Sequence, residues 1–303
     1  MDYGYYPGCS LHGTAKEFAL SIEECCQGMG IWLKEVPDWN CCGATAGHET
    51  SEELDLALSL RILGLAERNR LNPLLVPCAS CYSRLKLANI RVTKDRELLR
   101  RINELAGQNY EGRISVKHLT EALIDNKEPL KSSVVRPLTG IKIACYYGCL
   151  LARPPEVADF DDAENPVTMD QIVTVLGAEP LDWSHKTECC GASFTFSKTD
   201  ITLRLVGNIL EAAKLAGADA IAVACPLCHA NLDMRQTMAE QRNKREYRIP
   251  IIYISQLVGL AQGKDYQSLG LDKHMVSTER LVERISSQIS VAETESKSQR
   301  VGA

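Results

Sequence analysis

The stretch Asn40-Cys41-Cys42-Gly43 occurs a second time in this chain, as Glu188-Cys189-Cys190-Gly191. Each copy has a single cysteine well upstream and a Cys-x-x-Cys pair well downstream, with the spacings C-x31-C-C-x35-C-x2-C and C-x39-C-C-x34-C-x2-C. Ten of the thirteen cysteines therefore form two matching groups of five. We call them the first set (Cys9, Cys41, Cys42, Cys78 and Cys81) and the second set (Cys149, Cys189, Cys190, Cys225 and Cys228).

The match extends to the patterns around the cysteines. Cys149 follows Cys9 by 140 residues, and Cys225 follows Cys78 by 147. Strand-like apolar runs come in the same order in both parts, at residues 2–6, 31–36, 74–76 and 114–116 and again at 141–145, 220–224 and 251–253. Helical patterns lie between them, at residues 14–28, 91–101, 119–124, 169–176 and 199–216. The chain is therefore an internal duplication.

One further helix is predicted by a capping box, in which Thr50 precedes Glu53 by three residues. Its apolar stripe would run through Leu54, Leu58, Ile62 and Leu65. Strands that alternate with helices predict parallel sheets. We therefore expect an α/β fold with two pseudo-symmetric, Rossmann-like halves, each with a small parallel sheet and one Cys-Cys-Gly motif.

The predicted division is an N-terminal half over residues 1–135, a C-terminal half over 136–275, and a terminal helix with a disordered tail over 276–303. Leu281, Ile285 and Ile289 would lie on one face of that helix. Ligands of parallel sheets collect at the carboxyl ends of the strands. Cys9, Cys78, Cys149 and Cys225 each lie at or just after such a predicted end.

Composition limits the possible functions. The net charge is −5, and acidic and basic residues are mixed along the chain, without the basic excess of a nucleic-acid-binding protein. The N-terminus has no signal-peptide pattern, and no apolar run approaches the roughly 18–20 residues of a membrane span. We expect a cytoplasmic protein, in which thiols stay reduced. Thirteen cysteines there indicate metal binding or catalysis rather than disulfides.

Three kinds of thiol chemistry fit such a sequence. A structural zinc site uses Cys-x-x-Cys and two more ligands, but a tetrahedral site takes four thiolates where each set offers five. A thioredoxin-type redox pair explains two cysteines of each set and leaves three without a role. Iron–sulfur clusters are favoured, because they need four or more soft thiolates. The chain has neither the C-x2-C-x2-C-x3-C-P run of bacterial ferredoxins nor a G-x-G-x-x-G nucleotide motif.

With two Cys-Cys-Gly patterns at these spacings, the chain resembles the catalytic B subunit of heterodisulfide reductase, a family of double CCG-domain proteins. The resemblance covers residues 1 to about 275 and includes Tyr6-Pro7-Gly8-Cys9 and Tyr147-Gly148-Cys149. It implies that each set binds one noncubane 4Fe-4S cluster. The implied reaction is two-electron reduction of a mixed disulfide of coenzyme M and coenzyme B to two thiols, a reaction of methanogenesis. Two clusters related by a pseudo-twofold axis would each take one sulfur of the disulfide.

Other residues are candidates for supporting roles. His229 follows Cys228 and is a candidate proton donor, since imidazole titrates near neutral pH, or it orders the loop. The coenzymes of the family are anionic, so Arg153 and Lys198 are candidates for substrate binding, with solvated surface residues as the alternative. Cys25, Cys26 and Cys145 are expected to pack in the core. Cys145 is the one of these three that could approach a cluster.

Electrons must reach this chain from outside, because it has no cubane relay and no flavin motif. The resemblance implies two partners from the heterodisulfide reductase complex: a ferredoxin-like subunit that donates electrons to this chain, and a flavin-containing subunit that feeds the ferredoxin-like one. The helix at Leu281 and Ile285 is a candidate docking element. An alternative is a related role in bacterial or archaeal electron transfer or sulfur oxidation, with another disulfide or sulfur substrate. A further alternative is a zinc- or cluster-stabilised interaction module without catalysis.

Overall fold

The structure is a computed structural model, and it describes residues 1–287. It contains two parallel four-stranded sheets with the same topology. The first has the order β2-β1-β3-β4 and the second the order β6-β5-β7-β8. Their bounds are β1 Asp2–Tyr5, β2 Trp32–Glu35, β3 Leu74–Leu75, β4 Val116–Lys117, β5 Lys142–Tyr146, β6 Glu179–Pro180, β7 Ala220–Val223 and β8 Ile251–Tyr253. The α/β class and the two pseudo-symmetric halves are confirmed.

Helices connect the strands in each half. In the first half they are α1 Gly8–His12, α2 Lys16–Gly28, α3 Gly47–Thr50, α4 Glu52–Arg68, α5 Ala79–Lys94, α6 Arg96–Ala106, α7 Leu119–Asp125 and α8 Lys127–Ser133. In the second half they are α9 Thr168–Val175, α10 Thr199–Leu215, α11 Pro226–Met234, α12 Gln236–Asn243 and α13 Ile254–Ala261, with short 3-10 turns at Ala192–Phe194 and Leu271–Lys273. The proposed boundary near residue 135 stays a prediction.

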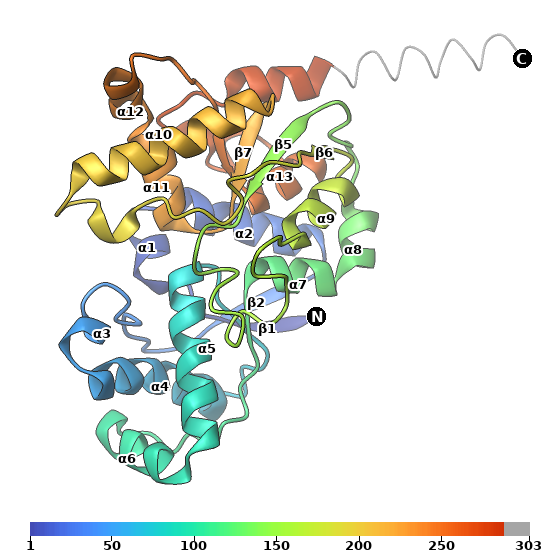
Figure 1. Cartoon of the computed structure of the whole chain (residues 1–303). Helices are drawn as coiled ribbons and strands as arrows, with labels where there is room; N and C mark the ends of the chain where they lie inside the picture. The colour runs from blue at the N-terminus through green and yellow to red at the C-terminus, as the bar shows by residue number, and fades with distance from the viewer. Residues whose placement is uncertain (288–303) are drawn as a thin grey trace, which may run out of the picture.

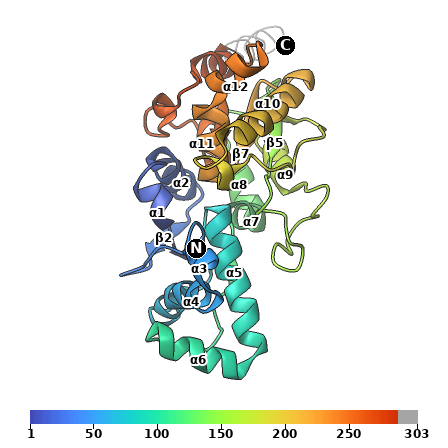
Figure 2. The same ribbon diagram turned by 60° about the vertical axis from the view of Figure 1, so that its left-hand side comes forward.

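The two halves dock reciprocally. Helix α2 of the first half packs on α13 of the second, and α7 of the first packs on α9 of the second. At the α2–α13 contact the Ser21 and Ser255 hydroxyls are 2.7 Å apart, and the rings of Phe18 and Tyr253 stack at 4.0 Å. Figures 1 and 2 both place α1 and α2 between the lower layer of α4 to α6 and the upper helices α11 and α12. One apolar cluster runs through both halves, and a second lies in the first half around α4 to α6.

Two helix predictions are wrong in detail. The charged helix predicted over 91–101 is broken at Asp95, whose carboxylate caps α6 by accepting from the amides of Glu97 and Leu98. The capping box at Thr50 does not form, because Thr50 belongs to α3, and Ser51 caps α4 instead. Of the predicted apolar stripe, Ile62 and Leu65 are buried as expected, Leu58 is half-buried and Leu54 is exposed.

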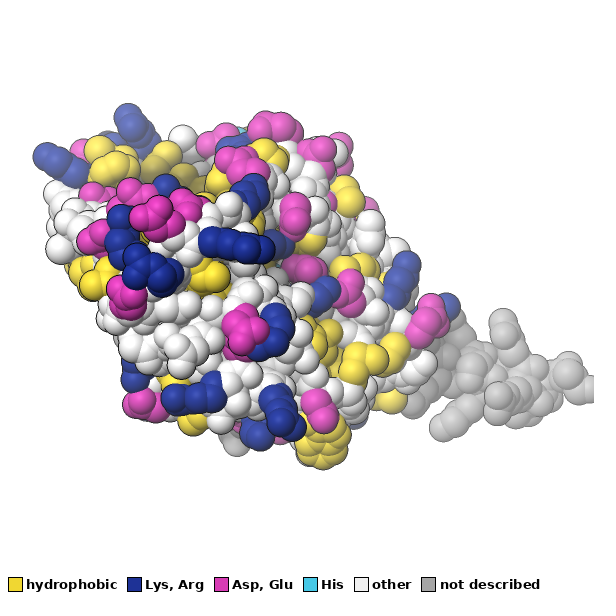
Figure 3. Space-filling view, turned by 90° about the horizontal axis from the view of Figure 1, so that it is seen from below, with side chains coloured by type: hydrophobic (Ala, Val, Ile, Leu, Met, Phe, Trp, Pro, Cys, Tyr) yellow, Lys and Arg dark blue, Asp and Glu magenta, His cyan; other side chains and the backbone are white. Residues whose placement is uncertain are grey.

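The lower face of the first half is an ordinary solvated surface. Figure 3, which views the molecule from below, shows basic side chains intermixed with acidic ones. Several are paired: Arg101 of α6 pairs with Glu53 of α4 at 3.4 Å, and Arg100 pairs with Glu104 within α6 at 2.6 Å. Exposed pairs of this kind contribute about 0–1 kcal/mol each to stability.

The terminal segment corrects another expectation. Residues 279–287 are helical as far as the structure describes them. Leu281 and Ile285 are buried in the shared core, so these two side chains are not available to dock a partner. Ile289 and the tail predicted over 292–303 lie outside the described residues. Within residues 1–287, no helix is both long enough and apolar enough to cross a membrane.

Candidate metal centre

The carboxyl ends of the strands position the thiols of both sets. Cys9 is in α1, directly after β1, and Cys78 is the residue before the first turn of α5, directly after β3. Cys225 holds the same place between β7 and α11. Each Cys-Cys-Gly loop follows the edge strand of its sheet, β2 or β6. The parallel topology therefore gathers five distant cysteines at one end of each sheet.

The five thiols of the first set form a row of contacts. The sulfur of Cys41 is 3.8 Å from that of Cys9, and the sulfur of Cys42 is 3.2 Å from that of Cys81. Cys78 in turn hydrogen-bonds to Cys81. Hydrogen bonds from the thiols of Cys41 and Cys81 lower the pKa of Cys42 to about 3, which favours its thiolate form.

The second set repeats this arrangement. Cys149 hydrogen-bonds to Cys189, and this bond lowers the pKa of Cys189 to about 6. The sulfurs of Cys190 and Cys228 are 3.7 Å apart, and Cys228 contacts Cys225. Hydrogen bonds from neighbouring thiols also lower the pKa of Cys225. The thiols that donate these hydrogen bonds change in the opposite direction, because the neighbouring sulfurs and burial raise the pKa of Cys41, Cys78, Cys81, Cys149 and Cys228. Each set therefore holds close sulfurs of which at least one favours the thiolate form, the form that binds metals.

Equivalent tyrosines and glycines support the two sets. The hydroxyl of Tyr6 donates to the carbonyl of Asn40 at 2.9 Å, and that of Tyr146 donates to the carbonyl of Glu188 at 2.6 Å. Each bond fixes the residue before a Cys-Cys pair. Inside the loops, the amides of Gly43 and Gly191 donate to the sulfurs of Cys41 and Cys189 at 3.5 and 3.3 Å.

The glycine before each first cysteine lies against a thiol. Gly8 has φ +72° and Gly148 has φ +67°, a conformation that L side chains rarely adopt. A Cβ at Gly8 would be 3.1 Å from the sulfur of Cys81, and one at Gly148 would be 3.1 Å from the sulfur of Cys228. Only glycine therefore leaves unobstructed space beside these sulfurs.

Each set combines exposed or half-buried thiols with buried ones. Cys9, Cys41 and Cys189 are exposed and Cys149 is half-buried, whereas the other six thiols are buried. Within residues 1–287, no group of three or more His, Cys, Asp or Glu side chains forms a ready site for a single metal ion. Five soft thiolates in a row fit an iron–sulfur cluster, which distributes its cysteine ligands over several irons.

The two sets meet at the middle of the molecule. The thiols of Cys78 and Cys225, one from each set, hydrogen-bond to each other. His118, a residue that the sequence analysis missed, is buried beside them and contacts the backbone before both cysteines. Its position at the end of a predicted strand was the one signal that it faces the site.

His229 is buried, as is Tyr253, on which it stacks at 4.3 Å. Its Nε2 is 3.2 Å from Nδ1 of His274, which the sequence analysis did not identify. Burial, and to a smaller extent the nearby His274, lowers the pKa of His229, so the ring is neutral at neutral pH.

The two candidate cations differ in their surroundings. Arg153 bonds to Thr187 at 3.0 Å and forms an ion pair with Glu164 at 3.3 Å. Lys198 is exposed immediately before α10, without an ion pair among the described residues. Neither side chain contacts a thiol among the described contacts.

The remaining cysteines lie in the core. Cys25, Cys26 and Cys145 are all buried. Burial raises the pKa of Cys145, whose charged neighbours are Asp170 and Lys186. Their packing role agrees with expectation, and Cys145 does not join the row of thiols.

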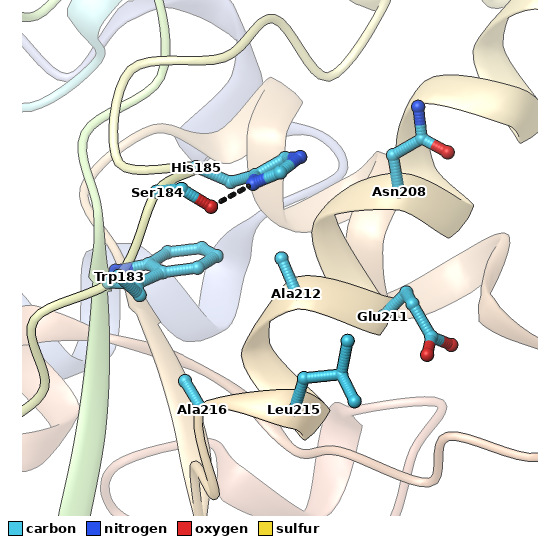
Figure 4. A pocket seen from close by; sticks show the side chains of 8 residues that line it. All are labelled: Trp183, Ser184, His185, Asn208, Glu211, Ala212, Leu215 and Ala216. Atoms are coloured by element: carbon cyan, nitrogen blue, oxygen red, sulfur yellow. Dashed lines mark hydrogen bonds between the residues drawn. The ribbon is translucent and has the colours of Figure 1, made fainter.

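A surface hollow of about 530 Å³ lies between residues 183–185, which precede the second Cys-Cys-Gly loop, and α10. Figure 4 shows Trp183, Ser184 and His185 on one wall and side chains of α10 on the other. No cysteine lines this hollow, so it is separate from the thiol sets.

Comparisons with known proteins agree with this geometry. The model of the CCG family, described as a cysteine-rich domain, matches residues 3–86 and again 143–233. The chain is 32% identical to the 8-methylmenaquinol:fumarate reductase membrane anchor subunit of Wolinella succinogenes, over 92% of this chain and 99% of that protein. It is 30% identical to the B subunit of the ferredoxin:CoB-CoM heterodisulfide reductase of Methanosarcina mazei, over 92% and 95%.

Among solved structures, a hypothetical protein from Helicobacter pylori has the same fold with a TM-score of 0.73 and 16% identity. The match covers 91% of this chain and about half, 52%, of the other. Two family matches in one chain, together with relatives aligned over most of their length, identify the protein. The chain belongs to the CCG cysteine-rich family, carries two copies of its domain, and is related over most of its length to B subunits of heterodisulfide reductase.

Proposed function

We propose that this protein is the catalytic subunit of a heterodisulfide reductase complex. It would bind two noncubane 4Fe-4S clusters and reduce a mixed disulfide of the coenzyme M–coenzyme B type to two thiols. The observation that carries the proposal is the pair of five-thiol sets, each at the carboxyl end of its own sheet and in contact through Cys78 and Cys225. The relatives named as B subunits of CoB-CoM heterodisulfide reductases support the choice of reaction.

The proposed ligands are the ten cysteines of the two sets. Their buried members would anchor each cluster, and the exposed Cys9, Cys41 and Cys189 mark the side from which a substrate can approach. When bound, such clusters supply one-electron redox chemistry and Lewis-acidic iron. The protein contributes the amides of Gly43 and Gly191, which donate to thiolate sulfur and stabilise its negative charge.

Metal analysis of anaerobically purified protein tests the ligand sets. We expect about four iron and four sulfide for each set. Replacement of Cys42 and Cys81 by serine should remove the iron of the first set and leave that of the second. A zinc-only protein would overturn the cluster proposal and favour a structural module.

The two sets correspond to the two sulfurs of a disulfide, and we propose that each set serves one sulfur. Freeze-quench EPR after mixing reduced protein with the mixed disulfide should then give new signals from both clusters. New signals from one cluster alone would contradict the proposal that each set serves one sulfur.

The negative charge of the proposed substrate allows a test of the two candidate substrate-binding cations. Removal of a cation that binds them should raise KM with little change in kcat. We expect a larger rise for Lys198→Ala than for Arg153→Ala, because Arg153 is already engaged by Glu164. Lys94→Ala is the matched control, since Lys94 ends α5 and Cys81 lies near its start, roughly 20 Å away by helix rise. An unchanged KM removes that residue from the proposal.

His229→Gln separates two roles for this histidine. If His229 donates protons to the product thiolates, the His229→Gln variant should have a lower kcat and a complete iron content. If it orders the loop through Tyr253 and His274, the iron content of the second set falls with the activity. Its buried, neutral ring favours the ordering role.

The proposed partners are the ferredoxin-like subunit and the flavin-containing subunit of such a complex, which would supply the electrons. Affinity purification of the tagged full-length chain from its own cells, followed by mass spectrometry, tests this. Recovery of other redox proteins instead would assign the protein to the alternative role in electron transfer or sulfur oxidation.

A second candidate follows from the similarity to the fumarate reductase subunit. The same two clusters would then pass electrons between a quinol and a dehydrogenase-type partner, without a disulfide substrate. Activity assays of the isolated complex with menaquinol and fumarate, beside assays with the mixed disulfide, distinguish the two functions.

A further inference from the structure

His118 is placed where the two halves touch. It is completely buried and directly precedes α7, at the end of β4. Its Nε2 lies 2.8 Å from the carbonyl oxygen of Pro77 and 3.2 Å from that of Ala224. These carbonyls belong to the residues immediately before Cys78 and Cys225, the two cysteines that join the sets.

The contacts assign the tautomer of the ring. The amide of Thr120 donates to Nδ1 of His118 at 3.2 Å, so Nδ1 is an acceptor and carries no proton. Nε2 therefore holds the proton and donates it to both carbonyls in a shared hydrogen bond. Burial lowers the pKa of His118 to about 4, so the neutral ring persists at neutral pH.

The hydrogen bonds from His118 to the two loops have no counterpart on the other side of the pseudo-twofold axis. The equivalent residue of the second half is Tyr253, which precedes α13 at the end of β8 as His118 precedes α7 at the end of β4. The Tyr253 hydroxyl makes no hydrogen bond to the backbone before either cysteine. Among the described hydrogen bonds, those of His118 are therefore the ones that directly join the backbone of the two Cys-x-x-Cys loops.

We propose that His118 is a positioning residue that sets the separation of the two cluster sites. Its N–H joins the loop before Cys78 to the loop before Cys225, and so holds the two thiols in contact. If the proposed function holds and each set binds a cluster, the electronic coupling between the two clusters depends on this hydrogen bond. The residue touches neither substrate nor thiol and acts through the backbone.

Two substitutions divide the roles of the ring. His118→Asn keeps an acceptor near Nδ1, which preserves the contact with Thr120, but removes the donor near Nε2. His118→Gln restores an N–H near Nε2 and loses the acceptor. A merely structural role predicts that the two variants behave alike or that Asn is the better replacement. The proposed role predicts that Gln retains the coupling and Asn does not.

EPR of the reduced, iron-loaded protein is the first readout. The interaction between the two clusters should be visible as splitting or broadening, which we expect to be reduced in His118→Asn and kept in His118→Gln, at equal iron content. Equal spectra for the wild type and both variants would overturn the inference.

A second readout does not require clusters. The full-length, chelator-treated protein is oxidised with diamide, and peptide mapping measures the Cys78–Cys225 disulfide relative to the Cys78–Cys81 disulfide. Loss of one hydrogen bond should lower the Cys78–Cys225 share about threefold to tenfold in His118→Asn, with His118→Gln near the wild type. Absence of iron from the wild type would contradict the proposed function, and this assay would still decide the role of His118. An equal share in all three proteins would refute it.

Discussion

At the scale of single residues, the glycines beside the thiols give the sharpest test of how the sets are built. We expect Gly148→Ala to lower the free energy of unfolding by about 1–2 kcal/mol, because alanine is strained at φ +67°. Its Cβ would also crowd the sulfur of Cys228. About half of the bound iron should therefore be lost, from the second set alone, as measured by metal analysis.

Gly217→Ala is the control for that substitution. Gly217 has φ +79°, and nothing lies within 4 Å of the position of its Cβ. It should lose a similar amount of stability in urea unfolding and keep its full iron content. Equal loss of iron in both variants would mean that backbone strain, and not the contact with Cys228, limits cluster binding.

Residues differ in how far sequence alone can identify them. The cysteines were predictable because ten of them repeat with nearly the same spacing. His118 and His274 occur singly, and their partners lie far away in the chain, as Ala224 does for His118 and His229 for His274. No local pattern encodes such contacts, because they arise only when the two halves dock.

At the scale of elements, the start of α4 provides a prediction. The hydroxyl of Ser51 accepts from the amide of Leu54 at 3.1 Å, while the hydroxyl of Thr50 donates to the carbonyl of Ala46, the residue before α3. Loss of an N-cap oxygen costs about 1 kcal/mol. Ser51→Ala should therefore lower the urea midpoint clearly and Thr50→Ala only slightly, with the iron content unchanged. If Thr50→Ala lowered the urea midpoint more than Ser51→Ala, the result would support Thr50 as the N-cap of α4, as the sequence predicted.

Other element predictions succeeded or failed for physical reasons. The strands were predictable because short apolar runs lie between glycines and cysteines, as at β5 and β7. The break at Asp95 was missed because a charged, periodic stretch continues on both sides of it. Helix α13 was missed because it is short and all of its residues are buried, Ser255 and Gln256 included, so it lacks the exposed polar face of a surface helix. Its burial between α2 and the second sheet explains this.

At the scale of the whole molecule, the duplication predicted two sheets but not how they face each other. The reciprocal contacts of α2 with α13 and of α7 with α9 turn the carboxyl ends of both sheets toward one interface. This docking buries His118 at the centre of the molecule. The terminal segment packs on the second half, where Arg284 bonds to Asp219 and to the carbonyl of Gly140 and where Leu281 and Ile285 are buried.

Docking also makes stability depend on pH. Burial lowers the pKa of both His118 and His274 to about 4, against roughly 6.5 in an unfolded chain. Above pH 6.5 the histidines are neutral in both the folded and the unfolded chain, so their protonation takes nothing from the free energy of unfolding. As the pH falls from 6.5 toward 4, these histidines become protonated in the unfolded chain and stay neutral in the folded one. The free energy of unfolding therefore falls by about 1.4 kcal/mol per pH unit for each histidine. Anaerobic urea unfolding between pH 7 and 5 should show this fall, and His118→Gln should remove about a third of it, because His229 is also buried as a neutral ring with a lowered pKa. Parallel curves for the two proteins would mean that His118 is not buried as a neutral ring.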